Sequence, residues 1–137
     1  MKVVFDGLIT YVNALTGEAH NAFYTAIGGR FYYEEAPQRT TFPFATYTMI
    51  SAAPDWSFDR DQHIMIIQID AFSEATGMTE ITTIQAALIA LLEYKDTTLS
   101  VSGYSFIYIK ENFHQITRED DFWHLIAQYE LMITKAS

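Results

Sequence analysis

The stretch HIMIIQIDAFSEATGMTEITTIQAALIALLEYK, residues 63–95, changes its hydrophobic period once, and that change decides the fold class. Its first ten residues alternate between an apolar face and a mixed face, which is typical of a strand buried on one side. After Thr76-Gly77 the apolar residues recur at helical spacing. The sequence therefore predicts a strand and then a long helix. The strand face holds Met65, Ile67, Ile69 and Ala71, and the helix stripe holds Ile81, Ile84, Leu88, Leu91 and Leu92.

The opposite flank of this helix is also apolar. It carries Ala86, Ala87, Ile89 and Ala90. A helix that is apolar on two flanks needs cover on both. We expect the sheet to cover one flank, and either the amino-terminal helix or a neighbouring subunit to cover the other.

The segments on either side favour further strands and short helices. Residues 42–50 and 104–113 are rich in aromatic and β-branched residues, which favours two more strands. Residues 4–15 have the spacing of a short amphipathic helix. A weaker helical stretch over 19–27 ends at Gly28-Gly29, where a left-handed glycine can close a helix. Between these elements, residues 30–38 are predicted as a loop with one strand-like turn, and 51–61 as a hairpin arm or long loop.

The last segment, residues 122–133, fits two periods. Trp123, Leu125, Ala127, Tyr129 and Leu131 alternate, but Phe122, Leu125, Ile126 and Tyr129 also fit a helix. We favour the strand, because a terminal helix would leave three strands to carry an unusual aromatic load. The expected fold is α+β: a four-stranded antiparallel sheet packed by one long helix and a shorter amino-terminal helix, in one domain over residues 1–137.

The composition excludes several classes of function. With 8 basic and 17 acidic residues, the net charge of −9 disfavours direct binding to a nucleic-acid backbone. The absence of cysteine excludes disulfides, thiolate nucleophiles and sulfur-bound zinc. No apolar run approaches the roughly 20 residues of a membrane span, and the amino terminus lacks a signal-peptide pattern. We expect a soluble protein made in a cytoplasm, with no membrane partner.

No motif for catalysis, metal binding or nucleotide binding is present. The four histidines, His20, His63, His114 and His124, have no metal-ligand spacing. Residues 119–121 are contiguous carboxylates, which favours a solvated turn or helix cap over acid and base catalysis. No serine lies in a nucleophile elbow. We therefore expect no catalytic residues, no cofactor and no metal.

One loop does carry large apolar side chains. Trp56 and Phe58 lie in APDWSFDRD, where a monomer usually places small polar residues. They either fold back over the core or form an interface. We predict assembly contacts at Trp56, Phe58, Asp59, Arg60 and Asp61.

Three segments in order carry a resemblance to a known family: GGRFYYEEAPQ at 28–38, FPFATYTMIS at 42–51, and IQIDAFSEATGMTEITTIQAALIALL at 67–92. From about Thr25 to the carboxyl end, the chain resembles the tail-terminator, or tail-completion, proteins of long-tailed bacteriophages. The resemblance implies a structural virion protein without enzymatic activity, assembled in the host bacterial cytoplasm. It would form a homo-oligomeric ring of about six copies. The ring would cap the head-proximal end of the tail tube, stop tube polymerisation, and dock the head-to-tail connector.

An alternative hypothesis comes from another class of function. An α+β domain with an aromatic sheet face can line a pocket for a small molecule or a reaction. This hypothesis predicts a closed apolar cavity in which polar groups such as His63, Asp70, His124 and Glu130 converge.

Overall fold

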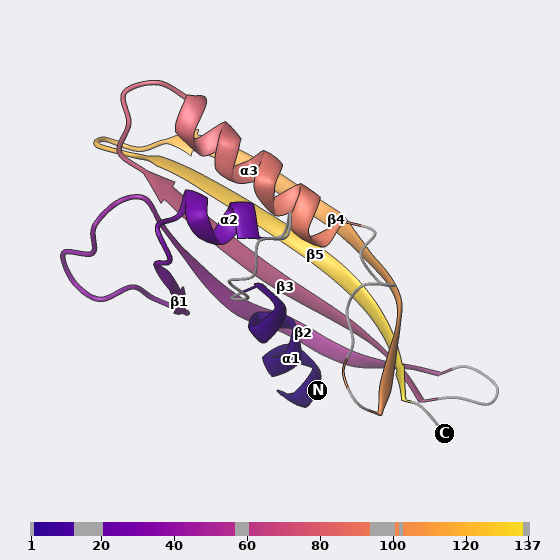
Figure 1. Ribbon diagram of the computed structural model, residues 1–137. Helices are drawn as coiled ribbons and strands as arrows, with labels where there is room; N and C mark the ends of the chain where they lie inside the picture. The colour runs from indigo at the N-terminus through magenta and orange to yellow at the C-terminus, as the bar shows by residue number, and fades with distance from the viewer. Residues whose placement is uncertain (1, 13–20, 57–60, 94–100, 102, 136–137) are drawn as a thin grey trace.

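The computed structural model describes residues 2–12, 21–56, 61–93, 101 and 103–135. Three helices and five strands follow one another along these residues (Figure 1). The first two helices precede the first strand, and the third helix lies between the third strand and the fourth. Their bounds are α1 Lys2–Val12, α2 Asn21–Ala26, β1 Phe31–Tyr33, β2 Phe44–Trp56, β3 Asp61–Ser73, α3 Thr79–Leu92, β4 Tyr104–Arg118 and β5 Trp123–Lys135.

The sheet has five strands in the order β1-β2-β3-β5-β4. Every neighbouring pair is antiparallel except β1 and β2, which are parallel. The predicted α+β class is confirmed, but a purely antiparallel sheet of four strands was wrong in detail. The fifth strand, β1, is three residues long, too short to show a hydrophobic period. It ends where Glu34 takes a positive φ of 63°.

The ambiguous last segment is a strand. β5 lies inside the sheet between β3 and β4, so both of its edges are hydrogen-bonded. Leu125, Ala127, Tyr129, Leu131 and Ile133 face the core and are at most 1% exposed. Alternation, rather than the helical spacing, was therefore the correct period.

Helix α3 forms as predicted, and its whole stripe from Ile81 to Leu92 is buried. Helix α2 packs against it, and α3 also contacts β3, β4 and β5. The second apolar flank is covered only in part, because Ala86 and Ala90 are exposed in the single chain while Ala87 packs against the core.

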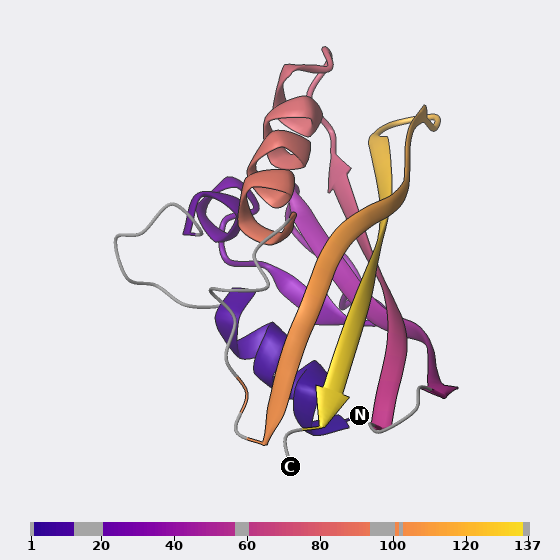
Figure 2. The same cartoon turned by 90° about the vertical axis from the view of Figure 1, so that its right-hand side faces the viewer.

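The helices all lie on one side of the sheet, as the two views agree (Figure 1, Figure 2). Helix α1 buries Val4, Leu8 and Val12, and the Tyr11 hydroxyl donates to the Leu91 carbonyl at 3.2 Å. No helix of the described chain covers the opposite face, which we call the open face. None of the described helices is long and apolar enough to cross a membrane.

The glycine pair closes α2 as predicted. The Gly29 amide donates to the Tyr24 carbonyl at 2.9 Å, and the Gly28 amide to the Thr25 carbonyl at 3.0 Å. This pattern is a Schellman motif, with Gly28 in the left-handed conformation at φ 63°. Arg30 then anchors the following loop, because its guanidinium donates to the carbonyls of Phe42 and Pro43.

Candidate functional site

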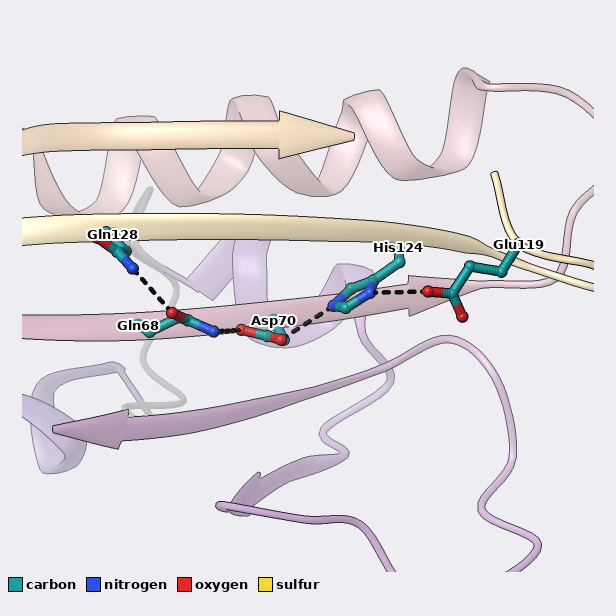
Figure 3. Close-up of polar contacts among 5 residues, drawn as sticks. All are labelled: Gln68, Asp70, Glu119, His124 and Gln128. Carbon is teal, nitrogen blue, oxygen red and sulfur yellow. Dashed lines mark hydrogen bonds and ion pairs between the residues drawn. The ribbon is translucent and has the colours of Figure 1, made fainter. Parts of the chain in front are cut away.

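A row of polar side chains crosses the open face between β3 and β5 (Figure 3). Gln128 donates to Gln68 at 2.9 Å, and Gln68 donates to Asp70 at 2.7 Å. The second carboxylate oxygen of Asp70 lies 2.9 Å from Nε2 of His124, and Nδ1 of His124 lies 3.5 Å from Glu119. The row, Gln128-Gln68-Asp70-His124-Glu119, therefore connects two strands and the turn before β5.

Strand alternation and register bring these residues together. Gln68 and Asp70 occupy the mixed face of β3, opposite the buried Ile67 and Ile69. Gln68 is directly paired with Gln128, whereas His124 is paired with Phe72 and reaches Asp70 diagonally. Residues two apart along a neighbouring strand are within reach of long side chains. The sheet thus fixes the geometry of the row.

The row favours the charged form of its histidine. The hydrogen bond that His124 donates to Asp70 is the main reason that the pKa of His124 is raised, with Glu119 adding to it, while partial burial opposes the rise. The His124 and Asp70 side chains are only 17% and 19% exposed. The imidazole ring also stacks on Phe72, with centroids 4.5 Å apart. An imidazolium ion is stabilised by both contacts.

The same row is poorly arranged for metal binding or catalysis. The two carboxylates sit on opposite nitrogens of the His124 ring, so they do not converge on one point in space. Within the described residues, no group of three histidine or carboxylate side chains could hold a metal ion. Both ring nitrogens of His124 therefore already lie close to carboxylates, Nε2 to Asp70 and Nδ1 to Glu119.

The residues of the pocket hypothesis are only partly brought together. Asp70 and His124 are in contact, but Glu130 instead binds the Tyr108 hydroxyl at 2.5 Å and lies 3.8 Å from Lys110. His63 lies farther along β3, paired with Ile133. Asp70 does line an open hollow of about 420 Å³ at one end of the sheet.

A cluster of aromatic rings borders this row on the open face. Phe44 stacks on Phe72 at 4.8 Å, and Phe42 and Phe122 pack on them at 5.1 to 5.8 Å. All four side chains are half-buried. We call Phe42, Phe44, Phe72 and Phe122 the aromatic patch. Aromatic groups that remain partly exposed beside satisfied polar groups are typical of protein interfaces.

Two of the predicted assembly contacts, Trp56 and Asp61, lie at the other end of β2 and β3. The backbones of Trp56 and Asp61 pair at the end of the β2–β3 ladder, so the described residues 51–56 and 61 belong to a hairpin arm rather than a long loop. Phe58, Asp59 and Arg60 lie outside the described residues. Whether this tip contacts a partner stays a prediction.

Sequence reasoning missed the partnership of Glu119 with His124 and the two glutamines of the row. Residues 119–121 do form an exposed turn, in which the Glu119 amide donates to the Phe122 carbonyl at 2.9 Å. The available signal was the polar pair Gln68 and Asp70, which interrupts an otherwise apolar run from residue 64 to residue 72. Their partners on β5 depend on register, which that pattern does not contain.

Comparison with known proteins places this fold. A chain from the virion of a native gene transfer agent particle aligns over 93% of this chain and 91% of its own length, with a TM-score of 0.75 at 12% identity. A second solved chain aligns over 90% of this chain and 98% of its own, with a TM-score of 0.51 at 12% identity. These two likenesses show a shared fold.

No curated protein sequence matches the chain. The family model described as Tail completion protein gp17 matches residues 14–134, which is most of the chain. The chain belongs to the tail completion protein family.

Proposed function

We propose that this protein forms a ring that caps the head-proximal end of a tail tube, ends tube polymerisation and provides the surface on which the head-to-tail connector docks. The whole chain would act as one domain, without catalysis and without direct contact with nucleic acid. Family membership supports the tail role. The observation that carries the proposal is the aromatic patch on a sheet face that no described helix covers.

The patch suits protein contact because of what surrounds it. Phe44, Phe72 and Phe122 pack on one another and leave part of each ring exposed. The polar row beside them is internally hydrogen-bonded, so a partner can cover it without leaving unpaired charges. Such a surface is rigid before contact, which lowers the entropic cost of association.

The hairpin tip is proposed as a second assembly contact. Trp56, Phe58, Asp59, Arg60 and Asp61 combine large apolar groups with charges of both signs. The backbone pairing of Trp56 with Asp61 holds the two ends of this tip together. Trp56→Ala is expected to weaken assembly while the far-ultraviolet circular dichroism and the melting temperature stay near wild type. Loss of the fold would instead assign Trp56 to the core.

The pocket hypothesis is less well supported. Asp70 and His124 use their hydrogen-bonding groups on each other, and the hollow beside Asp70 is open rather than closed. A small-molecule site normally presents unsatisfied polar groups in a concave, mostly enclosed space.

Electron microscopy of tail tubes tests the proposal. Tube protein of the same particle is polymerised with and without this chain, and tube length and end structure are measured. Short tubes with a ring at one end are expected. Phe122 lies in the turn between β4 and β5. Phe122→Ser therefore removes part of the aromatic patch without changing a strand residue. This variant should cap tubes less well, so longer tubes are expected. Tubes of unchanged length and uncapped ends with the wild-type chain would overturn the proposal.

A further inference from the structure

Both borders of the sheet are unpaired along much of their length. β4 pairs with β5 from Tyr104 to Arg118, and no described strand pairs with its other side. At the opposite border, β1 covers β2 only from Ala45 to Tyr47. From Thr48 onward β2 has no described neighbour on that side. Unpaired strand edges are templates for pairing with another chain.

Exposed apolar side chains gather on these same borders. Among the described residues, six large hydrophobic side chains are exposed, and four of them lie on the border strands. Tyr33 and Ile50 are 55% and 50% exposed on β1 and β2, and Ile107 and Phe113 are 41% and 45% exposed on β4. Edge strands usually carry lysine, proline or other charged groups that block association. The borders here are mixed: β4 carries the exposed charges of Lys110 and Arg118, and β2 carries Pro54 near its end, but Ile50 and Ile107 add exposed apolar side chains between them.

Irregularities in the strands coincide with these side chains. The β2–β3 register shifts between Met49 and Ser51, which places Ile50 in a bulge. The β4–β5 register shifts between Phe106 and Tyr108, which places Ile107 in another. Bulges redirect a side chain and are common next to functional surfaces. Each border therefore presents an isoleucine that the core does not use.

Strand polarity then fixes how two copies can join. β2, β3, β5 and β4 are successively antiparallel, so β4 runs opposite to β2. If two copies are placed side by side in the same orientation, β4 of one copy meets β2 of the next as an antiparallel pair. A contact between two different borders is heterologous, and such a contact builds a ring when the rotation between copies closes.

We infer that copies of this chain associate edge to edge, with β4 of one copy adding to the free part of β2 in the next. This inference rests on the proposed ring and names its subunit contact. The backbone hydrogen bonds of the added strand supply affinity, and Ile50 and Ile107 bury apolar surface at the junction. A two-fold contact of β4 with β4 would instead close a dimer and leave the β2 border exposed.

Two single substitutions test the contact by complementation. Ile50→Lys blocks the β2 border and leaves β4 intact, whereas Ile107→Lys blocks β4 and leaves β2 intact. Met78→Lys is the matched control, because Met78 is 45% exposed but lies at the start of α3, outside both border strands. Circular dichroism checks that each variant folds. Native mass spectrometry and tube-capping assays then report assembly.

Each border variant alone is expected to lose higher oligomers and to fail to cap tubes, while Met78→Lys behaves as wild type. Mixing the two border variants should give a one-to-one heterodimer and nothing larger, because each contributes one intact border. Dimers of Ile50→Lys alone would show a two-fold β4 contact and overturn the inference. Border variants that cap tubes like wild type would also overturn it while leaving the proposed function standing. Edge-dependent oligomers that never cap tubes would contradict the proposed function alone.

Discussion

His124 and Asp70 face each other across the β3–β5 ladder, with Nε2 and Oδ2 2.9 Å apart on the open face of the sheet. Because this contact favours the imidazolium ion, the folded chain holds the proton of His124 more tightly than the unfolded chain does. The pair therefore links the stability of the open face to pH.

The sign of the pH effect follows from the raised pKa of His124. The charged pair stabilises the fold fully below the ordinary histidine pKa of about 6.5 and loses this contribution as the pH rises through the raised value. Asp70→Asn should lower the free energy of unfolding by about 1 kcal/mol at pH 6. The loss should shrink by pH 9, where the histidine is neutral. Urea denaturation at both pH values measures the difference.

Glu130→Gln is the control for that experiment. Glu130 lies on the same face of β5, but its partners are Tyr108 and Lys110, and no histidine is among them. The loss in the free energy of unfolding caused by Glu130→Gln is therefore expected to be the same at pH 6 and pH 9. An equal, pH-independent cost for Asp70→Asn would show that the charge of His124 contributes nothing to folding.

Tyr129 gives a prediction of the opposite kind. Its side chain is fully buried, and no described group forms a hydrogen bond with its hydroxyl. Burial is the main reason that its pKa is raised, with the carboxylates of Glu111 and Glu93 adding to it. Tyr129→Phe removes a buried polar group without a partner, so the free energy of unfolding should stay unchanged or rise by up to about 1 kcal/mol.

Tyr108→Phe on the neighbouring strand is the matched comparison. The Tyr108 hydroxyl donates to the Glu130 carboxylate, and a hydrogen bond to a charged group contributes roughly 1.5 to 3 kcal/mol when part of the site is buried. Partial exposure should reduce the measured loss to about 1 kcal/mol. If Tyr129→Phe proved as costly as Tyr108→Phe in the same denaturation experiment, the Tyr129 hydroxyl would have a partner.

Elements with long, clean periods were predictable from sequence. β3 and α3 are 13 and 14 residues long, and both formed where their hydrophobic periods placed them. β5 was recovered because its alternation reflects burial on one face and pairing on both edges. The burial of Ile69 in β3 and of Tyr129 in β5 follows from the two-residue alternation of these strands.

Features that depend on register were not predictable. β1 has three residues and exists because Phe31–Tyr33 pairs with Ala45–Tyr47, a contact between segments more than ten residues apart. Contact between Asp70 and His124 requires the β3–β5 register. In this register His124 is paired with Phe72, which lies two residues along β3 from Asp70. The tail-completion family was identified from segment order, but neither the polar row nor the aromatic patch follows from that order.

The glycine pair at the end of α2 provides the last prediction. Gly28 has a φ of 63°, and a Cβ atom added there would lie 2.6 to 2.7 Å from the guanidinium of Arg30. Gly28→Ala therefore strains the backbone and displaces Arg30 from the carbonyls of Phe42 and Pro43. We expect a loss of roughly 1 to 2 kcal/mol in the free energy of unfolding.

Gly77→Ala separates this local strain from a general effect of replacing glycine. A Cβ atom at Gly77 meets no other atom within 4 Å, and Gly77 lies just before α3. Its replacement should change the free energy of unfolding by less than about 0.5 kcal/mol. Thermal melts of the two variants side by side measure the contrast. Equal melting temperatures would mean that neither the left-handed turn at Gly28 nor the position of Arg30 stabilises the join between α2 and β1.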